Sequence, residues 1–311
     1  MWGVGCSAQK LVHHIDSVLT VRKSVENFDT AYIRKPKEDW TFSARLNGSQ
    51  WEIVTDHKES HTKNTFNSYL KRTVSLTAAY KGVSLSLSID PARMFGRSSD
   101  IELSHATYGR RFGFEAQYHW SGKFDAKTKT AEQTYNISDY INHIAVINFR
   151  GYYAFNARKF AYGAAFTQNL IQRRSAGSLL LGVSALYVDG HVNEIPHVGM
   201  HETEVNMLMF GVGVGYGYNF VLPKNWLIHV SAIPTVVVAQ HNTISYAGES
   251  ARMKYALPEL MNTGRVSVCH NFRNFFVGAS SNLHFNMIGE RHNLTIQNSR
   301  WNARVFVGMR M

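Results

Sequence analysis

The chain has 311 residues, of which 44% are hydrophobic and 13% aromatic but only 18% charged. Its formal net charge is +11, yet Lys and Arg are spread along the chain and form no basic run interleaved with aromatic residues. This distribution argues against a nucleic-acid partner. No apolar run reaches the roughly 18 to 20 residues of a transmembrane helix. Two classes of protein remain. One is a soluble β protein, and the other is a membrane β-barrel, in which apolar residues alternate with polar residues along each strand and form no long apolar run.

The first residues resemble a processing site. Residues 1–8 look like the end of a signal peptide cleaved after Ala8. The basic and apolar regions that precede such a site are missing, so we expect a start codon placed too late; the alternative is a chain that is not exported. Residues 9–38 have near-helical apolar spacing and are expected to form a periplasmic helical segment. Cys6 and Cys269 allow at most one disulfide and have no zinc spacing.

From Asp39 onward the dominant pattern has a period of two. Between Phe112 and Trp120, for example, every second residue is apolar or aromatic and the residues between them are polar or glycine. Such alternation is typical of strands with one apolar face. We expect strands at 39–57, 69–80, 82–90, 100–108, 111–120, 143–157, 176–189, 204–220, 225–241, 263–271, 274–287 and 300–311.

A soluble sandwich would also alternate, but three features favour a membrane barrel. The expected strands reach about ten residues or more, which spans a bilayer when tilted. Tryptophans stand at strand ends, as in interfacial girdles, and short turns alternate with long loops. The expected fold is all-β, a single antiparallel transmembrane β-barrel of about 12 strands over residues 39–311. The tryptophans are Trp40, Trp51, Trp120, Trp226 and Trp301.

The loop pattern predicts an orientation. If tight turns are periplasmic and long loops are external, both ends of the barrel chain fall on the periplasmic side. The expected turns are Lys81, Gly109-Arg110, 222–224 and Phe272-Arg273, and the expected loops are 58–68, 91–99, 121–142, 190–203, 242–262 and 288–299.

One connection breaks this pattern. By parity, residues 158–175 should form a short periplasmic turn, but the segment is long, basic and partly apolar. Long connections in compact domains are usually functional or folded back on the body. We expect a plug, either inside the lumen or beneath it. Its polar residues are Arg158, Lys159, Gln172, Arg173, Arg174 and Ser175.

At this segment the sequence resembles a known family. The motifs are Tyr-Ala-Phe-Asn at 153–156, Arg-Lys-Phe at 158–160, Ala-Ala-Phe at 164–166 and Gln-Arg-Arg-Ser-Ala-Gly-Ser at 172–178, with earlier matches at 32–40, 80–85 and 108–113. They resemble the signature of an uncharacterised Bacteroidetes family, the domain-of-unknown-function family 4421, from about Asp29 to the end. The resemblance implies an outer-membrane barrel and supplies no activity and no catalytic residues.

A row of glycines runs along one expected strand. Between Phe210 and Phe220 every second residue is apolar or aromatic, and glycines fill most positions between. The row is not a phosphate loop, because no Gly-Lys-Ser/Thr follows. If Val and Tyr face lipid, the bare face points inward, so the lumen widens there or a backbone packs against it; the 158–175 segment is the expected backbone. The glycines are Gly211, Gly213, Gly215 and Gly217.

Basic residues dominate the expected inward set. Rings of Arg and Lys favour anions in pores; the alternative is that these residues pair with lumen carboxylates or plug carbonyls, as buried charges generally must. The acidic residues are Asp90, Glu102 and Glu115, and the basic residues are Arg45, Lys71, Arg111, Arg150, Arg265, Arg304 and Arg310.

Two weaker sites were considered. His197 and His201 could share a helical face and bind a divalent metal, although a solvated loop is the commoner explanation for such a cluster. A barrel lipid hydrolase would need a paired serine and histidine. Ser104 and His105 are adjacent in a strand and face opposite ways, and no nucleophile elbow is present. The other available groups are Ser281 and His270.

The function expected from the sequence is a narrow pore or small-solute transporter in the outer membrane, with a preference for anions. A structural or interaction barrel without conduction is the first alternative, and a barrel lipid hydrolase is the second. The expected partners are outer-membrane lipid, the barrel assembly machinery, a small anionic solute and a periplasmic protein that docks on residues 9–37. No cofactor and no catalytic residue are expected.

Overall fold

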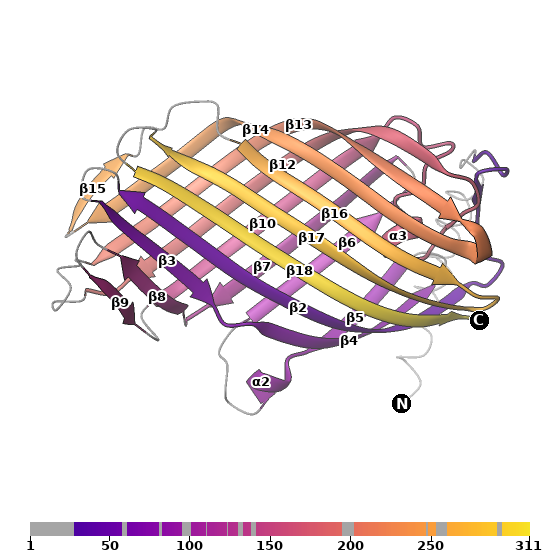
Figure 1. Ribbon diagram of the computed structural model, residues 1–311, viewed down its shortest axis with the longest axis horizontal. Coiled ribbons are helices and arrows are strands. Elements are labelled where there is room, and N and C mark those ends of the chain that lie inside the picture. Colours follow the sequence, from indigo (N-terminus) through magenta and orange to yellow (C-terminus); the bar gives the residue numbers. More distant parts are fainter. Residues whose placement is uncertain are drawn as a thin grey trace, which may run out of the picture.

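Side chains that alternate between apolar and polar faces place most of the chain in antiparallel strands, and these form one sheet curled into a barrel (Figure 1). The computed structural model describes residues 28–311 apart from 58–60, 81–82, 95–100, 110, 123, 130–132, 138–140, 195–201, 247, 253–259 and 291–293. The signal-peptide remnant expected at 1–8 and the helical residues expected at 9–27 therefore lie outside the described residues.

The wall of the barrel is built from long strands in hairpin order. Each pairs antiparallel with its neighbours from β6 through β18 to β2, β4 and β5. They are β2 (Trp40–His57), β4 (Lys71–Tyr80), β5 (Val83–Ile89), β6 (Ile101–Tyr108), β7 (Phe112–Ser121), β10 (Ile141–Ala154), β12 (Ala176–Val192), β13 (Thr203–Leu222), β14 (Trp226–Tyr246), β16 (Leu260–Asn271), β17 (Phe275–Glu290) and β18 (Leu294–Arg310).

Every segment expected as a strand lies within or overlaps one of these wall strands, but the count of about twelve is not confirmed, because the sheet contains 16 strands. The additional strands come from segments expected as long loops. In these segments the sheet extends beyond the twelve wall strands, because β3 pairs with β2 and β8, and β15 pairs with β14. The additional strands are β3 (Thr62–Ser68), β8 (Phe124–Lys129), β9 (Thr134–Ile137) and β15 (Glu249–Arg252).

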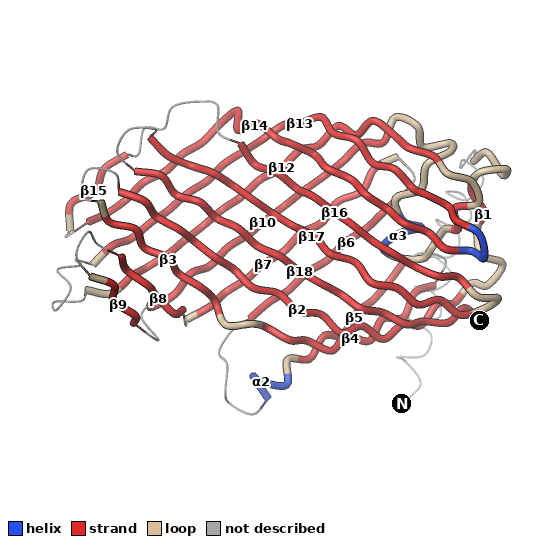
Figure 2. Tube along the Cα trace, in the orientation of Figure 1, coloured by secondary structure: helices blue, strands red, loops and turns tan. Residues whose placement is uncertain are grey.

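Short elements complete the chain. A two-stranded sheet joins β1 (Ile33–Arg34) to β11 (Ile171–Gln172). The helices are α2 (Pro91–Met94), α3 (Gly163–Phe166) and the 3₁₀ turn η2 (Pro223–Asn225). Figure 2 shows α3 and β1 at the same end of the barrel as the C-terminus, whereas β8, β9 and β15 lie at the opposite end. Among the described residues, no helix is both long and apolar enough to cross a membrane.

The two ends of the curled sheet meet. Among the described residues no ladder joins β5 to β6, but Ser88 of β5 and Ser104 of β6 line the same interior cavity. At the end of the barrel that carries α3 and the C-terminus, which we call the plug end, Trp40 and Met311 exchange both backbone hydrogen bonds at 3.0 Å. The start and the finish of the wall are therefore held side by side at this end.

The outer face of the wall is apolar. Large side chains such as Leu46, Leu103 and Phe112 are 62%, 64% and 67% exposed. Trp40 and Trp226 are exposed near the plug end, as a girdle requires. Trp51 does not belong to such a girdle: it is buried and points inward, because it shares the inner face of β2 with Ser43 and Ser49.

Candidate functional site

The residues that follow β10 turn back into the barrel. From Phe155 to Ser175 the chain forms turns, α3 and β11 instead of a short hairpin. Small and aromatic side chains let this segment fill the lumen closely, and Phe160, Tyr162 and Ala165 are at most 1% exposed. They pack against inward residues from opposite sides of the wall, including Leu180, Leu227, Phe276 and Phe306. We call residues 155–175 the plug segment.

A directional chain of hydrogen bonds ties the plug segment to the wall. Arg265 can only donate, and its Nη1 lies 3.0 Å from the Tyr162 hydroxyl. Tyr162 lies 2.7 Å from Ser231 Oγ, which lies 3.0 Å from His229 Nε2. His229 Nδ1 lies 2.7 Å from Asn219 Oδ1, which can only accept. A neutral His229 must carry its proton on Nδ1, because Asn219 Oδ1 only accepts, and the protons then all point one way, from Arg265 to Asn219.

The two ends of this chain are fixed by further contacts. Asn219 Nδ2 donates to the Ala161 carbonyl at 2.9 Å and to Gln172 Oε1 at 3.0 Å, which sets the orientation of the Asn219 amide. At the other end, Arg265 Nη2 lies 2.6 Å from Glu115 Oε2, and the Tyr108 hydroxyl donates to Glu115 Oε1. Strands β6, β7, β13, β14 and β16 are thus linked through the plug segment.

Ser231, His229 and Asn219 have the order of contacts found in hydrolase triads, and the sequence analysis did not identify them. The alternation of β14 places Ser231 and His229 on one face, which could have found that pair. His229 and Asn219 are 0% exposed, and Ser231 is 4% exposed. Because the serine oxygen is already bonded to Tyr162 and His229, a substrate cannot reach it here. We assign these side chains to anchoring the plug segment.

The remaining walls hold the plug segment by its carbonyl oxygens. Ser267 Oγ donates to the Ala165 carbonyl at 2.8 Å, and Cys269 Sγ lies 3.8 Å from the Ala164 carbonyl. Arg310 Nη2 reaches the Gln168 carbonyl at 3.3 Å and Asn271 Oδ1 at 2.8 Å. These contacts satisfy buried backbone groups of an irregular segment, which would otherwise be costly.

The residues before the wall form a strap under the plug segment. Asp29 N donates to the Arg158 carbonyl at 3.0 Å, and Arg173 N donates to the Tyr32 carbonyl at 2.7 Å. Lys159 Nζ lies 5.0 Å from the centre of the Tyr32 ring. The strap, residues 28–34, therefore adds a strand and an aromatic cover to the outer side of the plug segment. Of the polar plug residues, Gln172 is buried and donates to the Lys159 and Arg174 carbonyls, and Ser175 accepts from Val221 N.

A polar chamber of about 220 Å³ lies on the other side of the plug segment, with Phe166 and Thr167 in its lining. Its walls come from β2, β4, β5, β6, β7, β10, β17 and β18. The basic side chains that line it are Arg45, Arg150, Arg300 and Arg304. Within the described part of the chain, Glu115 is the carboxylate that lines it, and Glu115 is already bonded to Arg265 and Tyr108.

The expected inward bases have different positions. Arg265 and Arg310 are buried against the plug segment, and Lys71 is buried at the start of β4. The inward position expected for Arg111 is wrong. This residue precedes β7 and is exposed, and its Nη1 donates to the Tyr153 hydroxyl at 3.1 Å. The alternation of β7 does not extend to Arg111, because that residue lies in the turn before the strand.

Arg300 belongs to the chamber although the sequence analysis omitted it. It lies two and four residues from Asn302 and Arg304 on the same face of β18. The expected strand began at residue 300, so the position was read as a strand end. The period-two pattern, extended toward residue 294, would have included it.

The profile of the family described as "Domain of unknown function (DUF4421)" matches residues 27–310. The chain belongs to this family. A comparison with curated proteins finds no match. The outer membrane protease OmpT from Escherichia coli is similar in structure, with 5% identity and a TM-score of 0.45 over 89% of this chain and 97% of that chain.

Two other solved structures are similar at lower scores. The translocator domain of autotransporter NalP from Neisseria meningitidis has 10% identity and a TM-score of 0.35, with 99% of this chain and 100% of that chain covered. The P. putida toluene transporter TodX has 6% identity and a TM-score of 0.28, with 89% and 91% covered. Because these TM-scores are low, the likenesses carry no argument about what this DUF4421 chain does.

The glycine row of this family member faces inward, but the plug segment is not its neighbour at Gly213 and Gly215. A Cβ at Gly213 would lie 2.7 Å from Thr235 Cα, and one at Gly215 would lie 2.7 Å from Ile233 Cα. The backbone of β14 therefore covers these glycines. Pro234, which lacks an N–H, stands where the β13–β14 ladder is interrupted.

The two ends of the glycine row meet other groups. A Cβ at Gly211 would approach Thr235 Cγ2 at 2.7 Å and Ser184 Oγ at 2.9 Å. Gly217 does face the plug segment, since a Cβ there would lie 3.1 Å from Phe160 Cζ. The row thus serves strand packing over most of its length and plug packing at one end.

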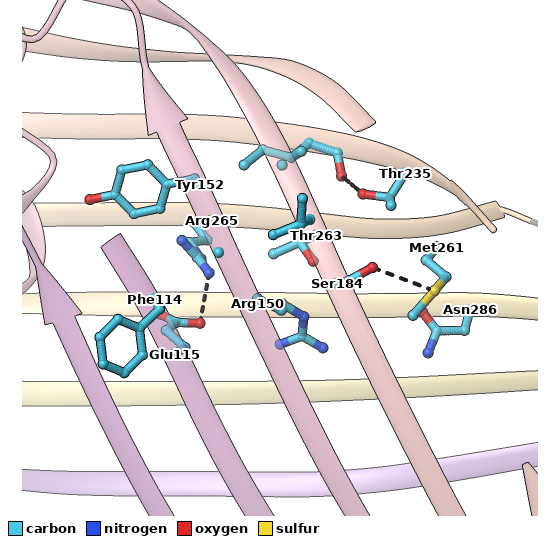
Figure 3. A pocket seen from close by; sticks show the side chains of 14 residues that line it. Phe114, Glu115, Arg150, Tyr152, Ser184, Thr235, Met261, Thr263, Arg265 and Asn286 are labelled. Carbon is cyan, nitrogen blue, oxygen red and sulfur yellow. Dashed lines mark hydrogen bonds and ion pairs between the residues drawn. The ribbon is translucent and has the colours of Figure 1, made fainter. Parts of the chain in front are cut away.

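A void of about 20 Å³ lies beside the chamber and has room for about one water molecule. Residues of β12 and β14 line it, together with Glu115 and Arg150, which also line the chamber. All of the side chains drawn in Figure 3 line this void, and Arg150 lies between the Arg265–Glu115 pair and the Ser184–Met261 pair. Ser184 Oγ donates to Met261 Sδ at 3.8 Å.

A second apolar cluster occupies the inner face toward the long-loop end. It contains Trp51, Val146, Met209 and Met261. The Trp51 ring lies 4.9 Å from the His119 ring and 5.6 Å from the Arg300 guanidinium. Trp51 and His119 are the next inward residues after Ser49 and Gln117, which line the chamber. These rings therefore form a roof opposite the plug segment.

The external loop and the hydrolase candidates contribute no assembled site. His197 and His201 lie outside the described residues. Nearby, the His191 ring is bracketed by Glu202 at 3.1 Å and Glu204 at 3.3 Å on different nitrogens, so the carboxylates do not converge. Across the described ranges, no group of three or more His, Cys, Asp or Glu is arranged to hold a metal ion.

Ser104 lines the chamber, whereas Ser281 lines an apolar surface pocket. His105 is exposed and contacts Thr107, and His270 is bonded to the Lys224 carbonyl. These serines and histidines are not brought together.

Proposed function

We propose that the chain is an outer-membrane β-barrel that passes small solutes through its lumen, with a preference for anions, and that residues 155–175 close one end. The observation that carries this proposal is a polar, arginine-lined chamber that lies directly on a folded-in segment within a barrel. A purely structural barrel has no need for a chamber of about 220 Å³ at that position.

The apolar outer face supports the membrane part of the proposal. Soluble monomers rarely expose large contiguous apolar patches, whereas side chains such as Leu76, Val214 and Val305 are 60%, 54% and 56% exposed on different parts of the wall. Lipid would cover this surface, and insertion would use the barrel assembly machinery. The plug end would face the periplasm, because the shortest turns gather there.

The preference for anions rests on the charges of the chamber. Four arginines line it and its one described carboxylate is bonded to Arg265 and Tyr108. Within the described part of the chain, no carboxylate is in ion-pair contact with Arg45, Arg150 or Arg304. Rings of arginine favour the passage of anions.

A non-conducting interaction barrel is the second candidate, favoured by one observation. The roof cluster around Trp51 and Met209 fills the inner face at the long-loop end, so both ends of the chamber are covered. In that case the strap at residues 28–34 would present the docking surface for a periplasmic protein. The enzyme alternative has no accessible serine and histidine pair to support it among the described residues, and we propose no catalysis.

Single-channel recording in planar bilayers tests the first candidate. The full chain should give brief openings, and a variant in which residues 158–174 are replaced by a short Gly-Ser linker should stay open, with at least ten times the mean current. A matched variant with the β15 hairpin shortened by a similar linker should behave like the full chain. No current from the linker variant, when it is folded and inserted, would rule out conduction.

A further inference from the structure

The chamber is enclosed on opposite sides. Phe166 and Thr167 of the plug segment belong to its lining, and the roof rings of Trp51 and His119 lie one inward row beyond it. At roughly 30 Å³ per water molecule, the volume of about 220 Å³ corresponds to about seven waters. This volume is of the order of one monosaccharide-sized solute.

Arginines from opposite sides of the wall supply positive charge to the chamber. Arg300 and Arg304 come from β18, Arg45 comes from β2, and Arg150 comes from β10. Arg304 Nε donates to Asn47 Oδ1 at 2.9 Å, and Arg150 Nη1 donates to His284 Nε2 at 2.9 Å. Each of these two guanidiniums spends one N–H on a neutral neighbour and keeps others for a further acceptor.

The chamber also presents hydrogen-bond acceptors, which are the amide oxygens of asparagine side chains. Asn148 Oδ1 and Asn282 Oδ1 are buried and have no hydrogen-bond partner among the described residues. Both residues line the chamber. A buried carbonyl oxygen without a donor is costly, so these oxygens are acceptors available to the N–H or O–H groups of a molecule in the chamber.

His284 adds an unused donor. Because arginine can only donate, the bond from Arg150 makes His284 Nε2 an acceptor, and the ring proton must lie on Nδ1. This Nδ1 is buried and has no partner among the described residues. Hydroxyl groups of Ser75, Ser88, Ser104 and Thr73 line the same chamber. The chamber thus offers cations, amide acceptors, an imidazole donor and hydroxyls together.

We propose that the chamber is a specific binding site for one small hydroxylated oxyanion, of the class of sugar acids and sugar phosphates. The arginines bind its carboxylate or phosphate, and the asparagine oxygens accept hydrogen bonds from its hydroxyl groups. Anions without O–H groups, such as chloride and acetate, offer no donor to Asn148 and Asn282, and neutral sugars lack the charge. The inference rests on the proposed function, because it identifies the solute class of the same lumen.

Isothermal titration of the refolded full chain in detergent micelles tests this site. The probes are glucuronate, glucose 1-phosphate, glucose and acetate at the same ionic strength. Glucuronate or glucose 1-phosphate should bind at least ten times more tightly than glucose and acetate, and their ratio distinguishes a carboxylate from a phosphate site. Equal binding of acetate and glucuronate would overturn the hydroxyl requirement, and equal binding of glucose would overturn the charge requirement.

Matched variants locate the binding. Arg304→Gln and Arg45→Gln should each weaken the tighter probe at least ten-fold, whereas Arg111→Gln, at the exposed arginine outside the lumen, should leave it unchanged. Each variant is first checked for the heat-dependent gel shift of a folded barrel, and Arg45→Gln serves if Arg304→Gln does not fold. Losses no larger than that of Arg111→Gln would overturn the proposal.

The binding and conduction results are separable. Current from the linker variant without selective binding by the full chain overturns only the binding site. Selective binding without current from the linker variant overturns only conduction.

Discussion

The two halves of the barrel interior differ although their strands alternate in the same way. The plug segment packs mainly against β12, β13, β14 and β16, with Phe276 of β17 and Phe306 of β18, and the polar chamber is lined by β2, β4, β5, β6, β7, β10, β17 and β18. The first half presents small inward residues such as Ser178, Gly217 and Ser267. The second presents long ones such as Arg45 and Arg304. Small inward residues leave room for the plug segment on the strands of the first half, and long arginines line the chamber.

Glu115 stands at the boundary between the halves, and its substitution has the largest expected effect on stability. Glu115→Gln leaves Arg265 buried without its carboxylate, which should cost about 3 kcal/mol or more in the free energy of unfolding. Urea unfolding in lipid vesicles, followed by tryptophan fluorescence, measures this. Glu52→Gln on the exposed face is the control, with an expected change below about 0.5 kcal/mol.

If Glu115→Gln were as mild as Glu52→Gln, the ion pair between β7 and β16 would not stabilise the site at which Arg265 holds Tyr162 of the plug segment. A double variant, Glu115→Gln with Arg265→Met, tests whether the loss of stability comes from the unpaired Arg265 charge. It should recover part of the loss, since removal of both charges avoids an unpaired buried one.

A smaller effect is expected in the glycine row. Gly213→Ala forces a Cβ against the backbone of β14, 2.7 Å from Thr235 Cα, and should cost about 1 to 3 kcal/mol. Gly264→Ala on β16 is the matched control, because the nearest atom to its added Cβ is 4.0 Å away. The same unfolding assay compares them.

This substitution also distinguishes packing of the strands from packing of the plug. Gly213→Ala should leave the mean current of the folded protein unchanged, whereas Gly217→Ala, which faces Phe160, should increase it. An increase of current in Gly213→Ala alone would restore the plug segment as the occupant of the row.

The wall could be predicted from the sequence because its signal is local. Alternation around Phe112 or Leu179 identifies a strand and its inner face without reference to any partner. Parity of turns and loops also identified residues 158–175 as exceptional. The inward positions of Arg45, Arg150, Arg265, Arg304 and Arg310 follow from the same alternation.

The contacts between distant segments could not be predicted in this way. Asn219, His229 and Ser231 form one chain with Tyr162 only because the plug segment returns into the lumen, and no local pattern encodes that path. Trp51 has the same sequence context as a girdle residue, but the length of β2 and the roof around His119 place it inside. Arg111 shows the reverse case, since the strand begins one residue later than expected, at Phe112.

A reversible lock on the plug segment tests the central claim most directly. The Ala164 carbonyl oxygen lies 3.8 Å from Cys269 Sγ, so the two residues are neighbours. In the variant Ala164→Cys, combined with Cys6→Ser, a disulfide between positions 164 and 269 would lock the plug segment to β16. The bilayer current of this variant is measured after oxidation and again after reduction, with the disulfide verified by mass. The account predicts no openings when the plug segment is locked and their return on reduction; equal currents in the two states, or none in either, would contradict it.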